Sequence, residues 1–142
     1  MNFKIDKNLI ANRIKLIELY LKRLKEMQAL TIDQFAIPDN FAIAAYNLRS
    51  ALEAVFDICA HILSRIPGAQ VEEYKQMALE MGRNGLVPQE FARNQLFKMA
   101  GYRNRLTHFY FEVSPNEMHD IINNNLNDFV TFLKNIKKIL NY

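Results

Sequence analysis

Cysteine is almost absent from this chain, which has a single one, Cys59, among 142 residues. No disulfide can therefore form within the sequence, and a small scaffold held together by disulfides is excluded. Because its neighbours are apolar, Cys59 is expected to be a buried core residue rather than a nucleophile. This cysteine usage fits a reducing compartment, and we expect a cytoplasmic protein.

Glycine and proline are also scarce, at four each, whereas 50% of the residues are hydrophobic and 23% are charged. This composition excludes collagen-like and disordered chains and favours a compact helical fold. The length predicts a single domain over residues 1–142. The formal net charge of +3 permits binding to nucleic acid or to an acidic partner without requiring it.

Long hydrophobic runs are missing as well. No apolar stretch approaches the roughly 20 residues that span a bilayer, so no membrane association is expected. The opening residues, MNFKIDKNLI, lack the apolar core of a signal peptide.

Common metal and nucleotide motifs are not found either. The sequence has no glycine-rich phosphate loop, CxxC or HExxH, and no glutamate is followed three residues later by histidine, as di-iron bundles require. His61 is expected to be structural, and His119 beside Asp120 is expected on the surface or in a cap. We therefore expect no metal and no cofactor.

Apolar residues instead recur at spacings of three and four, which predicts helices that each bury one face. The longest run of this kind is alanine-rich and extends from Phe41 to Ile66, after a turn at PDN where Asp39 or Asn40 could cap it. Its small side chains allow close approach, so it should lie centrally. The helices are expected near residues 6–28, 41–66, 71–83, 88–108 and 114–140, which together predict an all-α, antiparallel bundle of about five helices.

One stretch, AGYRNRLTHFYFEV at residues 100–113, concentrates polar chemistry. It contains the pattern R-x4-H-x-Y, formed by Arg103, His108 and Tyr110. Basic groups also favour the C-terminal end of an ordinary helix, because they complement its dipole. Residue chemistry alone leaves both interpretations open.

This pattern follows a glycine–aromatic pair, and GYRNRLTHFY resembles the signature of the HEPN superfamily and its HepT-like toxin branch. The order of expected helices resembles that branch over most of the chain, and Asn104 also matches. The resemblance implies a HEPN-like fold and a metal-independent endoribonuclease, toxic when free and paired with a nucleotidyltransferase antitoxin. RNA is then the substrate.

Cleavage of RNA without a metal needs a base for the 2′-hydroxyl, an acid for the 5′-oxygen and positive charge at the phosphorane. His108 is expected to transfer protons, because histidine does so near neutral pH. Arg103 is expected to hold the phosphate oxygens with its planar fork. Asn104 could orient either group, and Arg105 is expected to be an accessory RNA contact.

Helix geometry separates the two catalytic candidates. On a continuous helix, Arg103 and His108 would lie about 140° apart, so they would not share a face. Either the helix ends between them or the groups act from two chains. HEPN proteins are described as dimers with facing motifs, and we expect a homodimer with a composite site.

Tyr110 has no evident role in cleaving a phosphodiester. The resemblance implies that the partner nucleotidyltransferase transfers AMP from ATP onto this tyrosine and so neutralises the toxin. Local packing of Tyr110 is the alternative. Two other classes also stay open: a non-catalytic HEPN module that presents substrate or surface to a nucleotidyltransferase, and a helical interaction protein in which the motif is accidental.

Overall fold

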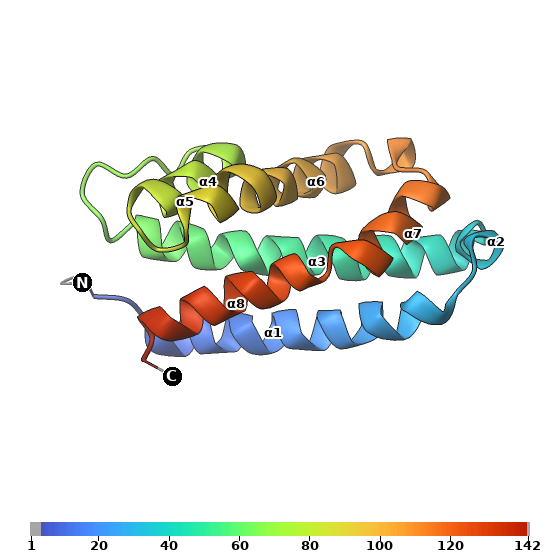
Figure 1. The fold of residues 1–142 in the computed structure, drawn as a ribbon, viewed down its shortest axis with the longest axis horizontal. Coiled ribbons are helices and arrows are strands. Elements are labelled where there is room, and N and C mark those ends of the chain that lie inside the picture. The colour runs from blue at the N-terminus through green and yellow to red at the C-terminus, as the bar shows by residue number, and fades with distance from the viewer. Residues whose placement is uncertain (1–3, 142) are drawn as a thin grey trace.

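The structure, a computed structural model, describes residues 4–141, and its regular elements over that range are all helices (Figure 1). The expected all-α bundle is confirmed. Its elements, in chain order, are α1 (Lys7–Glu26), α2 (Ile32–Phe35), α3 (Pro38–Leu63), α4 (Tyr74–Arg83), α5 (Gln89–Phe91), α6 (Phe97–His108), α7 (Pro115–Asn124) and α8 (Asn127–Ile139). None of the described helices is long and apolar enough to cross a membrane.

Helix α1 buries the apolar stripe that its sequence spacing predicts. It begins at Lys7 because the side chain of Asp6 accepts a hydrogen bond from the Leu9 amide. The buried positions are Ile10, Ile14, Ile17, Leu21 and Leu24. They join one hydrophobic core shared with the other helices. The single-domain boundaries at residues 1 and 142 stay a prediction.

Helix α3 occupies the centre of the bundle, as its small residues predict. It lies between α1 and α8 on one side and α4 and α6 on the other (Figure 1). Ala44, Ala51 and Cys59 are fully buried along it. The expected cap was wrong: Pro38 occupies the first turn, and Ile37 precedes it without a side-chain cap. Proline suits that position because the first amides of a helix have no helical acceptor.

The segment between α4 and α6 is less regular than expected. Helix α4 begins at Tyr74 rather than Val71, and α5 continues through a π-helical segment, Ala92–Leu96, into α6. Gly82 lets α4 approach this segment, because a Cβ there would lie 2.6 Å from the Cβ of Ala92. This close packing holds α4 against the segment that leads into α6.

The C-terminal helix, expected as one element over 114–140, is two helices. Its start is confirmed, because the Ser114 hydroxyl accepts a hydrogen bond from the Glu117 amide at 3.1 Å. The helix then ends at Asn124, and Asn125 leaves the helical region with φ −119°. Asparagines in a row favour such a break, because their side-chain amides compete for backbone hydrogen bonds; that of Asn123 donates to the His119 carbonyl at 2.8 Å.

The cysteine and the two other histidines have structural surroundings. Burial raises the pKa of the Cys59 thiol, in line with the expected core position. His61 Nε2 accepts a hydrogen bond from the Asp6 amide at 2.9 Å, which ties α3 to the start of α1. The ring of His119 packs edge-on against Phe35, with centroids 5.4 Å apart.

Candidate functional site

The motif lies at the C-terminal end of α6 and in the turn that follows. Arg103, Asn104, Arg105 and His108 all belong to α6, and Tyr110 begins a short 3₁₀ turn. The helix ends because Phe109, with φ −138° and ψ 36°, leaves the helical region. The structure therefore places the expected site residues on one short segment at one end of α6.

Arg103 is held by an aromatic ring that sequence spacing did not single out. Its guanidinium carbon lies 4.1 Å from the ring centroid of Tyr74 at the start of α4, a cation–π contact. A hydrogen bond to Asn104 Oδ1 is long, at 3.5 Å. Its Nε is buried without a partner, and no ion pair between residues 4 and 141 includes it. Arg103 is thus positioned while its charge stays available to an anion.

His108 is the last residue of α6 and is exposed. Its ring lies 6.2 Å from that of Phe109, and no described side chain forms a hydrogen bond with it. An exposed imidazole without a fixed partner can exchange protons with a substrate.

Tyr110 presents its phenol to solvent. The side chain is 50% exposed, between Phe109 and Phe111, and the latter is 75% exposed. Its ring lies 6.3 Å from that of Phe41 on α3. Contact on one side and exposure on the other leave Tyr110 accessible to another macromolecule.

Arg105 forms an ion pair with Glu117 of α7. Its two terminal nitrogens donate to the two carboxylate oxygens at 2.6 and 2.9 Å. These hydrogen bonds hold the pKa of Glu117 below its usual range. Burial raises the pKa of the neighbouring Tyr102, and Glu117 adds to that shift. The pair joins the end of α6 to α7. The expected contact of Arg105 with RNA stays a prediction, and Arg105 would then have to bind both Glu117 and RNA.

Helix α6 is unbroken from Arg103 through His108, so these residues lie about 140° apart in rotation. One chain does not place both side chains on one face of the helix. Of the two alternatives raised by the sequence, a helix that ends between them is wrong.

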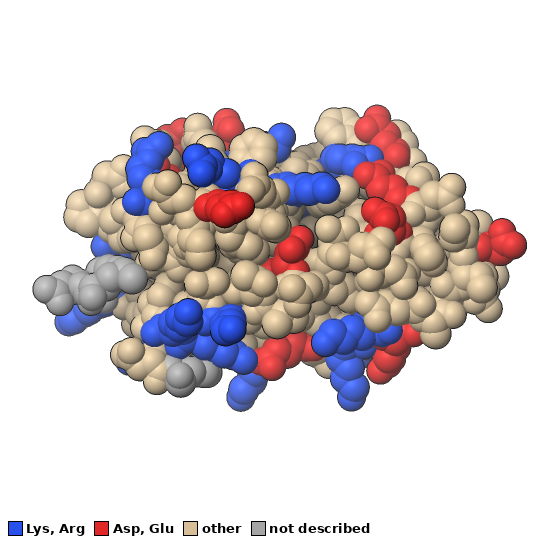
Figure 2. Space-filling view, viewed as in Figure 1, with Lys and Arg blue, Asp and Glu red and all other residues tan. Residues whose placement is uncertain are grey.

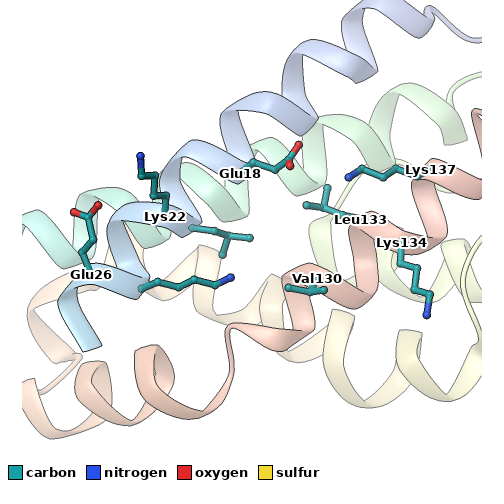
Figure 3. Close-up of a pocket in the computed structure, with 9 residues that line it drawn as sticks. Glu18, Lys22, Glu26, Val130, Leu133, Lys134 and Lys137 are labelled. Carbon is teal, nitrogen blue, oxygen red and sulfur yellow. The ribbon is translucent and has the colours of Figure 1, made fainter. Parts of the chain in front are cut away.

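A large groove lies elsewhere, between α1 and α8. Its volume is about 780 Å³, and it is lined by apolar residues together with charged residues of both signs, namely Lys22, Lys25, Lys134, Lys137, Glu18 and Glu26 (Figure 3). Figure 2 shows basic side chains gathered in two groups along this edge of the molecule. The groove contains no motif residue and no histidine, so it offers no group suited to proton transfer near neutral pH. Within the described range, no three histidine, cysteine or acidic residues cluster as metal ligands.

Sequence reasoning missed Tyr74 and Glu117, the residues that hold Arg103 and Arg105. Neither contact follows from helical spacing, because each joins α6 to a different helix. Only the packing of α4 and α7 against α6 reveals them.

Proteins of known activity resemble this chain over nearly its whole length. A tRNA nuclease HepT from Aphanizomenon flos-aquae (strain 2012/KM1/D3) is 27% identical, over 96% of this chain and 92% of its own. An mRNA nuclease HepT from Shewanella oneidensis is 28% identical, over 92% of this chain and 97% of its own.

Solved structures extend the likeness to the fold. The Shewanella oneidensis HEPN toxin, tri-AMPylated and in complex with an MNT antitoxin, has a TM-score of 0.80 and 27% identity. That match covers 92% of this chain and 97% of the toxin. A toxin–antitoxin structure with AMP-PNP has a TM-score of 0.82 at 24% identity, with 92% of this chain and 98% of that chain covered. The family model for Ribonuclease HepT-like proteins matches residues 17–136, and the chain belongs to this family.

Proposed function

We propose that this protein is a metal-independent endoribonuclease toxin whose activity is controlled by a nucleotidyltransferase antitoxin. The observation that carries the proposal is the R-x4-H-x-Y motif at an open helix end, where His108 is exposed and Arg103 has no acidic partner among residues 4–141. The nuclease names of its relatives and the toxin–antitoxin complexes among its structural neighbours support it. A cytoplasmic location is part of the proposal.

The proposed reaction is a transesterification within the RNA chain. The 2′-oxygen attacks the adjacent phosphorus, and the bond from phosphorus to the 5′-oxygen of the next nucleotide breaks. A base removes the 2′-proton and an acid protonates the leaving oxygen, roles suited to His108. Arg103 stabilises the negative charge on the phosphorane oxygens. The products end in a 2′,3′-cyclic phosphate and a free 5′-hydroxyl.

The site is completed by a second copy of the chain. Because α6 is continuous, Arg103 and His108 of one chain face different directions. Two motifs that face each other across a dimer would place an arginine of one protomer near a histidine of its partner. Two histidines would then be available for the successive roles of base and acid.

Tyr110 is the proposed point of control. Its phenol oxygen would attack the α-phosphorus of ATP held by the antitoxin, with pyrophosphate as the leaving group. The half-exposed side chain is accessible to such a partner. The attached phosphodiester would bring negative charge and bulk beside the motif, where it could pair with Arg103 and exclude RNA. One structural neighbour is described as tri-AMPylated, which supports this chemistry.

The catalytic test compares purified wild-type protein with the single variants Arg103→Ala and His108→Ala on RNA. Each variant should lose activity about 100-fold or more, since each removes a positioned charge or proton carrier. The helical circular dichroism should stay unchanged, the activity should persist in EDTA, and the products should carry cyclic phosphate. Full activity in the His108→Ala protein would refute the catalytic role of His108, whereas wild-type protein that binds RNA without cutting it would favour a non-catalytic binding module.

The control of Tyr110 is tested by co-expression with the cognate nucleotidyltransferase followed by intact-mass measurement. Wild-type protein should gain one or more units of about 329 Da, the mass of an added adenylate group, mapping to Tyr110. Tyr110→Phe should stay toxic and escape neutralisation. Tyr46→Phe, which removes another exposed phenol, is the matched control and should be modified as wild type. Equal rescue of the Tyr110→Phe protein without an adduct would refute the role of Tyr110.

A further inference from the structure

Three buried side-chain polar atoms in the described part of the chain lack a hydrogen-bond partner: Nε of Arg49, Nε of Arg103 and Oγ1 of Thr107. Such atoms are rare in folded proteins, and each calls for an explanation. Arg103 and Thr107 are four residues apart on α6, so they share one face of that helix. Arg49 comes from α3, the helix against which α6 packs.

Two aromatic contacts fix how Arg49 lies relative to the motif. Near the start of α3, the ring of Phe41 lies 6.3 Å from that of Tyr110. Further along α3, Phe56 packs on Tyr74 with centroids 5.5 Å apart, and Tyr74 carries the guanidinium of Arg103. Helix α3 therefore contacts Tyr110 directly and reaches Arg103 through Tyr74.

Arg49 falls between these two contacts. It follows Phe41 by eight residues, a rise of about 12 Å along the axis of α3. Rotation about that axis separates Arg49 from Phe56 by only about 20°, so the two side chains share a face of α3. Helix α6 runs antiparallel to α3 (Figure 1). Going from Tyr110 toward Arg103 along the chain therefore leads in the same direction as going from Phe41 toward Arg49 on α3. The two arginines thus come from facing helices at a similar level of the seam between α3 and α6.

The charge of Arg49 is only weakly compensated. Its nearest acid is Glu53, with Nε 3.8 Å from the carboxylate and the two side chains 39% and 43% exposed. A pair this long and this exposed contributes little. The guanidinium lies 6.0 Å from the ring of Tyr46, which shields one side of it. Arg103 has no acidic partner at all among the described residues, so this seam presents two guanidinium groups to an anion.

We infer that Arg49 is an additional RNA-positioning residue, which holds a backbone phosphate of the substrate beside the one gripped by Arg103. This inference rests on the proposed ribonuclease function and adds a residue outside the R-x4-H-x-Y motif. A guanidinium fork fits phosphate oxygens with two parallel hydrogen bonds. Because the unpaired Nε atoms are themselves buried, RNA would contact the terminal nitrogens of the two guanidinium groups.

The test measures binding of single-stranded RNA as a function of salt, in a His108→Ala background that cannot cut. Arg49→Gln should weaken binding about 10-fold, the loss expected for one charge-assisted contact. The slope of log affinity against log salt should fall by about 0.7, the value for one phosphate contact on a single strand. Arg49→Lys should keep the slope and recover part of the affinity, because it keeps the charge and loses the fork.

Arg23→Gln is the matched control. Arg23 is an exposed arginine of α1 without an ion pair in the described structure, and its loss removes the same charge. It should leave affinity and salt slope unchanged. In the cutting protein, Arg49→Gln should raise KM about 10-fold while kcat changes little, since binding is lost rather than proton transfer.

Several outcomes would overturn the inference. If Arg49→Gln lowers the melting temperature or the dimer mass but keeps the wild-type salt slope, Arg49 is structural. If it loses binding to the antitoxin and retains binding to RNA, its anion is a protein carboxylate. If wild-type protein cuts and binds RNA while Arg49→Gln and Arg23→Gln behave alike, this inference alone fails. If wild-type protein neither binds nor cuts RNA, the proposed function fails with it.

Discussion

The ion pair between Arg105 and Glu117 should stabilise the end of α6 by an amount that a double-mutant cycle can measure. Two hydrogen bonds of 2.6 and 2.9 Å join the groups, whose side chains are 37% and 29% exposed. Exposed pairs contribute about 0.2–1 kcal/mol, and a two-bond geometry places this one at the upper end, about 1 kcal/mol. For a chain of 142 residues, that corresponds to a shift of about 3 °C in Tm.

The cycle uses Arg105→Ala, Glu117→Ala and the double variant, with urea unfolding followed by circular dichroism. The pair Arg13–Asp57, which joins α1 to α3 through a single hydrogen bond of 3.1 Å, is the matched control. Its coupling energy should be smaller, about 0.5 kcal/mol or less. A coupling energy near zero for Arg105 and Glu117 would refute the reasoning from geometry.

The same coupling should depend on pH. Because the folded protein lowers the pKa of Glu117, the carboxyl binds its proton more weakly when folded than when unfolded. The stabilisation is therefore present above the unfolded pKa, about 4.3, and is lost as pH falls through the lowered folded value. A coupling energy that does not shrink between about pH 5 and pH 3 would contradict this assignment.

The cycle also separates the two roles of Arg105. If Arg105 only joins α6 to α7, Arg105→Ala and Glu117→Ala should reduce RNA cleavage alike, because both loosen the segment that carries His108. If Arg105 also contacts RNA, its loss should weaken RNA binding further and lower the salt slope, whereas loss of Glu117 should not.

Three further predictions concern the scaffold. Gly82→Ala should destabilise the protein by about 1–3 kcal/mol in urea unfolding, because the new methyl group meets Ala92 at 2.6 Å; unchanged stability would show that α4 can move away. Cys59 should resist a thiol reagent until the protein unfolds, since it is fully buried and burial raises its pKa; rapid labelling of native protein would contradict this. Burial lowers the pKa of His61, so the stability that neutral His61 supplies should be present above about pH 6.5 and lost on acidification; His61→Gln, which can still accept from the Asp6 amide, should not show that loss.

The sequence predicts most helices correctly because their burial pattern is local. The stripe of α1 and the small residues of α3 each specify a face, and a face must be buried somewhere. The errors lie at helix ends. Asn125 interrupts a pattern that otherwise continues to Leu140, and Pro38 replaces the expected caps, since hydrophobic spacing says little about where a helix stops.

The candidate site shows the same division. By itself, the sequence determined an all-helical fold, the motif residues Arg103, His108 and Tyr110, and their resemblance to HepT-like toxins, because each is encoded in short-range order along one segment. Tertiary structure alone decided that Tyr74 carries Arg103, that Glu117 binds Arg105, and that Phe41 of α3 contacts Tyr110. These relations join helices 12 or more residues apart in the chain, and only the packing of one helix on another sets such distances.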